Sequence, residues 1–306
     1  MNVVPLREIE CDDPVAHYDA DEAAALLRLP NRAIEACVPA AFHHTDYPTR
    51  VTHKSALWRY ADTMHDRRAR KIFDKLGGLT VLELSLLAAI TSRVSAVTAS
   101  FGHTIIPINA PLAGLFAYRM VKSYYASGTV FEIGPGSGYL GAFLLRDGFD
   151  YRSTDITQAF HLWQNEFFGT PQMPWWEWID HKRPDFPVDV MVCNHALNEM
   201  RESALRYLIV RAERMLTENG VLLLDDLGAG YLRHEQQTAD IFNSRGWNIA
   251  HIGAKSYAFV PPGRKPPVLR PLEEKTRTWA DLEKLWADLG ATPNPDDEFA
   301  DFIEGR

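Results

Sequence analysis

Short apolar runs alternate with amphipathic segments from Gly128 onward, and this alternation is the clearest pattern in the chain. The runs have the length and the β-branched and aromatic content of buried strands, and they are Thr129–Ile133, Tyr151–Thr154, Val188–Cys193, Val221–Leu224, Trp247–Ile252 and Ser256–Val260. Strands that alternate with helices predict a mostly parallel, doubly wound α/β sheet covered by helices. The last two runs are separated by only three residues, too few for a helical crossover, and therefore predict an antiparallel hairpin.

The first 127 residues have helical spacing and little strand alternation. Asp21 and Glu22 open a run of alanine and leucine that Pro30 closes. Other apolar positions recur at offsets of three and four, namely Leu82, Leu86, Ala89 and Ile90, and then Leu112, Leu115, Phe116 and Met120. We therefore expect a helical N-terminal subdomain over 1–127, a sheet domain over 128–262, and a C-terminal extension over 263–306 with a helix near Trp279–Leu289.

Charge and cysteine content restrict the partners and the compartment. The net charge of −8 and the pI near 5.8 oppose a nucleic-acid binder, because phosphate contacts depend on clustered lysine and arginine. A small or neutral substrate fits better. Cys11, Cys37 and Cys193 are too few and too scattered for a disulfide framework or a zinc cluster, which favours a reducing, cytoplasmic compartment.

Neither an export signal nor a membrane span is expected. Acidic residues occupy the N-terminal region where a secretory signal would need an apolar stretch. The most apolar segment, Leu79–Ser100, contains Glu83 and Arg93, and the nine uncharged residues between them fall well short of the ~20 that span a bilayer. A buried helix is the better interpretation of this segment.

A glycine-rich turn follows the first predicted strand, in Val130-Phe-Glu132-Ile-Gly134-Pro-Gly136-Ser-Gly138-Tyr-Leu-Gly141. Glycines admit a positive φ and lack the Cβ that would keep a ligand from the backbone, and the following helix offers free amides. A nucleotide-like ligand is therefore expected. Two classes of ligand, S-adenosylmethionine and a dinucleotide, fit such a turn. The dinucleotide is included because Gly136–Gly141 satisfies the G-x-G-x-x-G pattern of Rossmann dinucleotide-binding folds.

Three observations favour S-adenosylmethionine (SAM) over a dinucleotide. Glu132 occupies a strand-end position that is usually apolar in dinucleotide folds, and its carboxylate suits the cationic amino group of a methionine. The terminal hairpin is the methyltransferase variant of the doubly wound fold. Only one mononucleotide-type half is evident, whereas dinucleotide folds typically have two.

Further polar residues follow the predicted strands at the edge where open α/β sheets bind ligands. Asp155 ends the second strand and can accept hydrogen bonds from both ribose hydroxyls; its alternative role is the N-cap of a helix over Ile156–Phe168. Asp180 could reach the adenine amino group after a poorly defined third strand. Ile156 and Asn194 complete the predicted cofactor-binding residues.

The segment from Glu132 to Gly138 resembles the first motif of class I SAM-dependent methyltransferases, and the resemblance covers about 135 residues. This resemblance implies a Rossmann-like sheet of seven strands. More narrowly, the segments Val192–Met200 and Tyr118–Ala126 resemble the sugar O-methyltransferase family found with polysaccharide and deoxysugar pathways. That resemblance implies methyl transfer from SAM to a sugar or glycan hydroxyl in polysaccharide biosynthesis.

An alcohol is a reluctant nucleophile, so a general base or a metal ion should lie beside the acceptor. His195 follows the fourth strand and is the predicted base, and Glu199 would orient its ring if a helix begins near His195. Otherwise His195 caps or packs at a helix start. Asp225 and Asp226, after the fifth strand, resemble the magnesium-binding pair of metal-dependent O-methyltransferases, but Asn194 stands where those enzymes place another acid. Magnesium is therefore possible but not favoured, and the pair could instead cap a turn or bind the acceptor.

The sequence thus predicts a SAM-dependent O-methyltransferase whose helical N-terminal subdomain covers a small-molecule or glycan acceptor and could form a homodimer contact. Three alternatives stay open: a methyltransferase acting on a phenol, carboxylate or amine; an NAD(P)-dependent oxidoreductase; and a SAM-fold subunit without catalysis.

Overall fold

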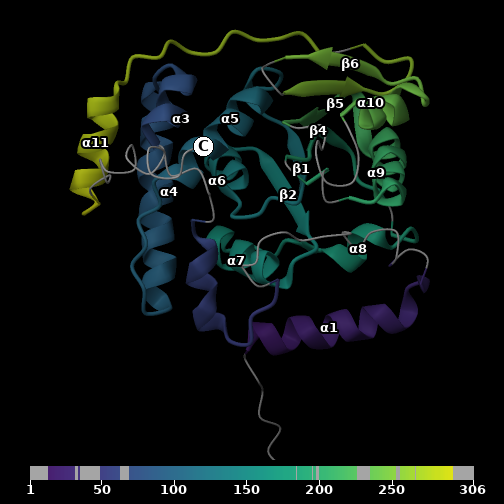
Figure 1. Ribbon diagram of the computed structural model, residues 1–306, viewed down its shortest axis with the longest axis horizontal. Helices are drawn as coiled ribbons and strands as arrows, with labels where there is room; N and C mark the ends of the chain where they lie inside the picture. Colours follow the sequence, from purple (N-terminus) through teal and green to yellow (C-terminus); the bar gives the residue numbers. More distant parts are fainter. Residues whose placement is uncertain are drawn as a thin grey trace, which may run out of the picture.

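A computed structural model describes residues 13–31, 34, 49–62, 69–183, 185–194, 196–197, 200–225, 235–252, 256–265 and 267–291. Its centre is a seven-stranded sheet in the order β3-β2-β1-β4-β5-β7-β6 (Figure 1). The strands are β1 (Thr129–Ile133), β2 (Asp150–Asp155), β3 (Met173–Pro174), β4 (Val188–Val192), β5 (Leu216–Leu224), β6 (Asn248–His251) and β7 (Tyr257–Val260).

The first five strands are parallel, and β7 runs antiparallel to both β5 and β6. The predicted doubly wound sheet with a terminal antiparallel hairpin is therefore confirmed. The fifth strand is longer than predicted: it begins at Leu216 instead of Val221, and the register shifts between Val188 and Val190 of its neighbour. The first half of this strand contains polar residues, so the apolar run in the sequence begins later than the strand does.

The strand register brings three chain segments to one edge of the sheet. Ile133, the last residue of β1, pairs with Thr154 of β2, and Glu132 pairs with Val192 of β4 on the other side. Because parallel strands end at the same edge, the residues that follow β1, β2 and β4 become neighbours. This is the carboxyl edge, where the predicted ligand-binding residues lie.

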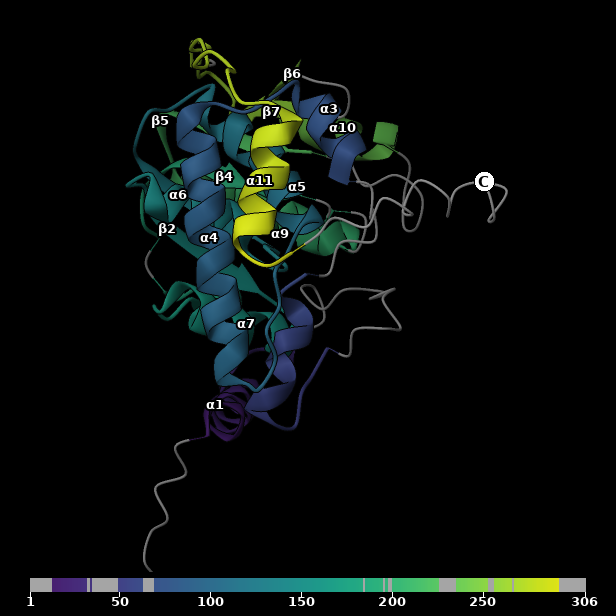
Figure 2. The ribbon, with the colours of Figure 1, turned by 90° about the vertical axis from the view of Figure 1, so that its left-hand side faces the viewer.

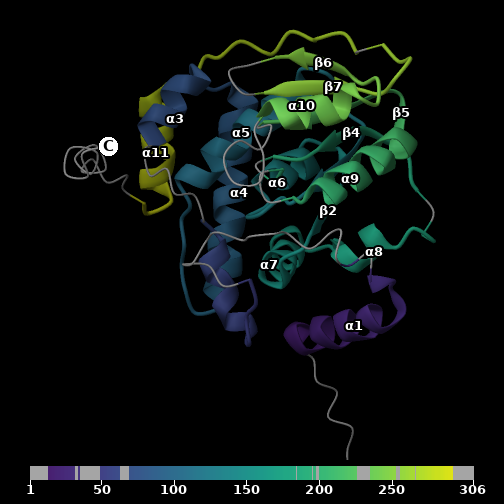
Figure 3. The same cartoon turned by 45° about the vertical axis from the view of Figure 1, so that its right-hand side comes forward.

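Helices cover both faces of the sheet (Figures 1 and 3). The helices α6 (Tyr139–Arg146) and α7 (Gln158–Phe168) follow β1 and β2, whereas α9 (Glu202–Met215) and α10 (Glu235–Asn243) lie on the other face. The short α8 (Trp175–Ile179) follows β3 near the carboxyl edge, and its three tryptophans are buried core residues.

Helices from the N-terminal region pack against α6, α7 and α8 or against one another. They are α1 (Pro14–Arg28), the 3₁₀ helix η1 (Lys54–Tyr60), α3 (Ala69–Leu76), α4 (Val81–Ser100) and α5 (Asn109–Lys122). The first helix begins at Pro14, seven residues before the predicted start at Asp21. The cause of this earlier start is local. Asp13 caps the helix by accepting a hydrogen bond from the Val15 amide, and proline suits the first helical position.

Helix α4 is long and apolar enough to cross a membrane by length and composition alone, a test that core helices of soluble proteins also pass. It buries Leu86, Ile90 and Val94 within the protein, as predicted for this segment. Its N-terminus carries a capping box between Thr80 and Glu83, and the Glu83 carboxylate also binds the Arg119 guanidinium at 2.7 Å.

The segment after β7 passes along the β6 edge of the sheet (Figure 1) and returns to the N-terminal helices (Figure 2). Its backbone pairs Arg277 with Leu79 before α11 (Trp279–Asp288) begins. The Trp279 ring packs edge-on against Phe73 of α3 with 5.4 Å between the ring centroids. The C-terminal extension therefore packs onto the N-terminal helices at a distance from the carboxyl edge.

Candidate functional site

The glycine turn between β1 and α6 has one position that is open to a ligand. Gly134, Gly136 and Gly138 have φ values of 68°, 55° and 79°, which side chains rarely adopt. A Cβ on Gly134 would lie 2.9 Å from Ala196, and one on Gly138 would lie 2.7 Å from the Phe168 ring. A Cβ on Gly136 would meet nothing within 4 Å. Gly134 and Gly138 thus permit close packing, whereas Gly136 leaves its backbone accessible to a ligand.

Asp155 is held against this turn at the end of β2. Its carboxylate accepts hydrogen bonds from the Thr157 amide at 2.8 Å, from the Gly136 amide at 3.3 Å and from Gln164 Nε2 at 3.4 Å. Burial raises the pKa of Asp155 to about 6, although these hydrogen bonds lower it. The alternative of a helix N-cap is wrong, because α7 begins at Gln158 and its N-cap residue is Thr157.

Glu132 is a second buried carboxylate close to Asp155. It is 3% exposed and accepts a hydrogen bond from the Tyr151 hydroxyl at 2.6 Å. Burial raises the pKa of Glu132 to about 7; the Tyr151 hydrogen bond lowers it and the charge of Asp155 raises it. Among the described residues, no arginine or lysine forms an ion pair with either carboxylate. The pair therefore favours a ligand that brings its own positive charge.

Replacing Glu132 by glutamine should stabilise the free protein at pH 8. A carboxyl with a folded pKa near 7 and an ordinary value of 4.5 contributes stability below pH 4.5, and this stability is lost as the pH rises through 7. The neutral glutamine amide keeps a hydrogen-bond acceptor for Tyr151. It also avoids the cost of ionising a buried carboxyl, which lowers the free energy of unfolding by up to about 3 kcal/mol. Urea unfolding at pH 5 and pH 8 measures this difference. A variant that is less stable than the parent at pH 8 would contradict the prediction.

Tyr151 also depends on the absence of a side chain at Gly141 in α6. A Cβ at this position would lie 2.3 Å from the Tyr151 ring, far inside van der Waals contact. We expect Gly141→Ala to lower the free energy of unfolding by roughly 1–3 kcal/mol through overpacking, despite the better helix propensity of alanine. Thermal unfolding of Gly141→Ala and of the parent protein measures the loss. Equal stability of Gly141→Ala and the parent would refute the clash.

Two buried oxygens at the same carboxyl edge have no hydrogen-bond partner among the described residues. They are Oδ1 of Asn194, which follows β4, and Oγ1 of Thr154, which precedes Asp155. Polar atoms that are removed from water without a partner are costly, and a ligand can supply the missing partner. Asn194 thus lies where the sequence predicts a cofactor contact, beside Ala196 and the glycine turn.

The two remaining predicted cofactor-binding residues are less closely connected to the glycine turn and to Asp155. Ile156 is half-buried directly after Asp155. Asp180 lies at the C-terminal end of α8, and its carboxylate accepts the Lys182 amide at 3.0 Å. No hydrogen bond in the described part of the chain joins Asp180 to the glycine turn or to Asp155, so its role at the adenine stays a prediction.

The predicted catalytic residues fall largely outside the described part of the chain. His195, Glu199 and Asp226 are not among the described residues. The assumption that a helix begins near His195 is wrong, because Ala196, Leu197 and Met200 are not helical and α9 begins at Glu202.

Asp225, at the end of β5, accepts a hydrogen bond from the Ser256 hydroxyl at 2.7 Å. This contact ties β5 to the residue before β7. Across the residues with a described position, no group of three histidine, cysteine, aspartate or glutamate side chains could hold a metal ion. The magnesium alternative therefore stays a prediction.

Residues that sequence reasoning missed lie over the first turns of α7. Asp19 accepts a hydrogen bond from Gln158 Nε2, and Gln158 Oε1 accepts one from the Val51 amide at 2.8 Å. Gln164 donates to the Gly136 carbonyl at 2.7 Å and so braces the glycine turn. A glutamine within the buried face of an amphipathic helix is the one signal that could have indicated Gln164.

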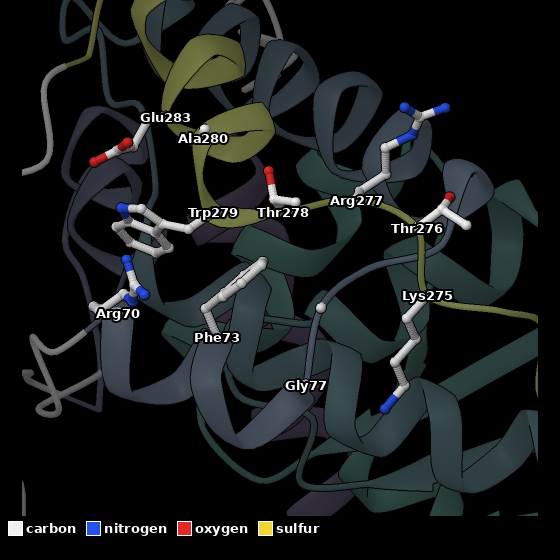
Figure 4. Close-up of a pocket in the computed structure, with 11 residues that line it drawn as sticks. Arg70, Phe73, Gly77, Lys275, Thr276, Arg277, Thr278, Trp279, Ala280 and Glu283 are labelled. Carbon is white, nitrogen blue, oxygen red and sulfur yellow. The ribbon is translucent and has the colours of Figure 1, made fainter.

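A surface hollow lies away from this site, between α3 and the segment that leads into α11 (Figure 4). Arg70, Phe73, Lys275 and Trp279 are among its lining residues, and the Arg70 guanidinium lies 5.2 Å from the Trp279 ring centroid. The cationic side chains point in different directions and do not converge on one point (Figure 4). The hollow contains none of the predicted site residues.

No family model and no curated protein matches this chain. Among solved structures, it is similar to a TehB-like SAM-dependent methyltransferase from Corynebacterium glutamicum, with a TM-score of 0.41 and 15% identity over 50% of this chain and 88% of that one. It is also similar to DesVI from Streptomyces venezuelae, with a TM-score of 0.39 and 9% identity over 49% and 91% of the two chains. The glycopeptide N-methyltransferase MtfA, solved with SAM, gives a TM-score of 0.38 and 13% identity over 49% and 87%. At this level of similarity the activities of these proteins do not transfer to this chain.

Proposed function

We propose that the protein is a SAM-dependent methyltransferase that methylates a hydroxyl of a sugar or glycan-type acceptor. The observation that carries the proposal is the buried Asp155 carboxylate, which is fixed to the Gly136 amide at the carboxyl edge of the sheet. An acidic residue at the end of the second strand is the acceptor that a ribose diol needs, and the adjacent open glycine backbone admits the rest of the nucleoside.

The topology favours this cofactor over a nicotinamide dinucleotide. A dinucleotide fold repeats its parallel mononucleotide-binding half, whereas here β7 is antiparallel and closes the sheet as a hairpin with β6. Two buried carboxylates near one turn also disfavour the pyrophosphate of a dinucleotide, because they would repel it. The oxidoreductase alternative therefore has less support.

Each predicted residue has a separate task in this proposal. When bound, SAM supplies an electrophilic methyl group on a positively charged sulfur. Glu132 balances the positive charge of the ligand, Asp155 accepts the ribose hydroxyls, and Gly136 permits close approach to the backbone. His195 accepts the proton of the acceptor hydroxyl. A role for Glu199 is not part of the proposal, because the helix that would place it beside His195 does not form.

The acceptor assignment rests on the segments Val192–Met200 and Tyr118–Ala126 and on the acidic composition of the chain. A neutral polyol fits a protein with a net charge of −8 better than an anionic acceptor does. Phenols, carboxylates and amines are the alternative acceptors.

Methyl transfer from labelled SAM to a panel of glycosides, phenols, carboxylates and amines tests the proposal. We expect incorporation into a glycoside and no requirement for added Mg²⁺ after treatment with a chelator. Strong methylation of phenols with no methylation of any glycoside would exclude the sugar assignment. Binding of NAD or NADP in place of SAM would exclude the methyltransferase itself.

A further inference from the structure

Helix α1, outside the sheet domain, lies across the end of the sheet where the cofactor is proposed to bind (Figures 1 and 3). It contacts α7 and α8, which follow β2 and β3. Asp19 of α1 binds Gln158, only three residues after Asp155, and Glu22 accepts the Trp175 indole N–H at 2.8 Å. These contacts fix α1 over the residues that follow Asp155.

Tyr18 is the residue of α1 that is aimed into this region. Its side chain is 5% exposed, and its ring lies between His161 and Trp176, with centroid distances of 5.1 and 4.9 Å. The buried Tyr18 hydroxyl has no hydrogen-bond partner within the described part of the protein. The hydrogen of the nearby Trp175 indole is donated elsewhere, to Glu22.

The surroundings keep this hydroxyl protonated. Burial raises the pKa of Tyr18 far above its usual value, and the charges of Glu22 and Asp155 raise it further, whereas the Arg50 charge and the nearby Trp175 indole N–H lower it. Tyr18 therefore offers a hydrogen-bond donor in the electrostatic field of the Asp155 carboxylate.

His161 supplies a second donor without a partner beside Tyr18. Burial lowers the pKa of His161 to about 4, so the ring is neutral at physiological pH. The Asn165 amide nitrogen, a donor, lies 3.1 Å from Nε2, which places the ring hydrogen on Nδ1. This buried Nδ1 forms no hydrogen bond among the described residues.

A vicinal diol complements this set of groups. Each of its hydroxyls can donate a hydrogen to the Asp155 carboxylate and accept one from a neutral donor such as Tyr18 or His161. A phosphate does not complement it, because it has no hydrogen for a carboxylate and because the nearby cation, Arg50, is already paired with Asp19 and Glu22. Building on the proposed function, we propose that the Tyr18 hydroxyl, with His161 Nδ1 beside it, binds the ribose diol of the cofactor opposite Asp155.

Calorimetric titration of Tyr18→Phe with S-adenosylhomocysteine tests this assignment, because phenylalanine keeps the ring packing and removes only the hydroxyl. We expect the Kd to rise by about 10-fold, as for the loss of one buried hydrogen bond. Tyr124→Phe is the matched control, since Tyr124 is also buried and precedes β1 at the opposite edge of the sheet. Its Kd should equal that of the parent.

Analogues of S-adenosylhomocysteine that lack the 2′- or the 3′-hydroxyl separate ribose contact from indirect effects. Tyr18→Phe should bind one of these analogues as tightly as the parent does, because the contact that the substitution removes is already missing. Equal affinity of Tyr18→Phe and the parent for S-adenosylhomocysteine would overturn the inference, and so would an equal loss with every analogue. A parent protein that binds no S-adenosylhomocysteine would instead overturn the proposed function, on which the inference depends.

Discussion

His195→Ala should lower the rate of methyl transfer by roughly 100- to 10,000-fold, the range that a positioned general base contributes. The acceptor hydroxyl needs to lose its proton as the carbon–oxygen bond forms, and water is a poor substitute for an imidazole in a closed site. Because His195 is proposed to act on the acceptor, the Kd for S-adenosylhomocysteine should stay unchanged. Single-turnover rates with labelled SAM and calorimetry measure the two quantities separately.

Two further measurements distinguish a base from a packing residue. Added imidazole should restore part of the activity of His195→Ala, and the acidic limb of the pH–rate profile should change. His181→Ala is the matched control, since His181 is exposed in a turn and should keep full activity. A different result would favour the magnesium alternative with Asp225 and Asp226 over a general base. In that case His195→Ala would keep its methyl-transfer activity, a chelator would abolish this activity, and added Mg²⁺ would restore it.

Asp155→Ala should weaken cofactor binding by roughly 100-fold or more. Two hydrogen bonds from ribose hydroxyls to one carboxylate contribute about 1.5–3 kcal/mol each, and alanine removes both. Alanine also frees the Gly136 and Thr157 amides, which Asp155 holds at 3.3 and 2.8 Å. Calorimetric titration with S-adenosylhomocysteine measures the change.

Asp150→Ala is the control within the same strand, because Asp150 is exposed at the start of β2 and its carboxylate pairs with Arg152 at the surface. Asp155→Asn preserves the shape and one acceptor oxygen and should fall between the alanine variant and the parent. With a folded pKa near 6, Asp155 gains a proton as the pH falls below 6, and the affinity of the parent should decline there. Unchanged affinity of Asp155→Ala would remove the observation on which the proposed function rests.

The two buried carboxylates at the proposed site should lower the free energy of unfolding of the free protein when they are ionised. Both Glu132 and Asp155 have raised pKa values, so each disfavours the folded state once it is ionised. A cationic ligand would relieve this cost, and the stabilisation of the protein by SAM should therefore exceed that by a neutral nucleoside such as adenosine. Sites that trade stability for function in this way are common.

The sequence by itself determined the order of the strands along the chain and the nature of the glycine turn. Apolar runs bounded by turn residues are local signals, and the three-residue gap before Ser256 excludes a parallel crossover for steric reasons alone. The identity of Glu132, Gly136 and Asp155 as candidates followed from their positions after strands, because the ends of parallel strands share one edge. These inferences need only chain connectivity.

Tertiary structure decided which groups surround that edge. The position of Tyr18 beside His161, or of Asp19 beside Gln158, depends on how α1 packs more than 130 residues away along the chain, and no local pattern encodes such a contact. Likewise, the register shift in β4 and the early start of β5 at Leu216 follow from pairing between strands. Long-range packing also buries Glu132 and Asp155 and so raises their pKa values, because desolvation depends on every element that covers a group and not on its neighbours in sequence.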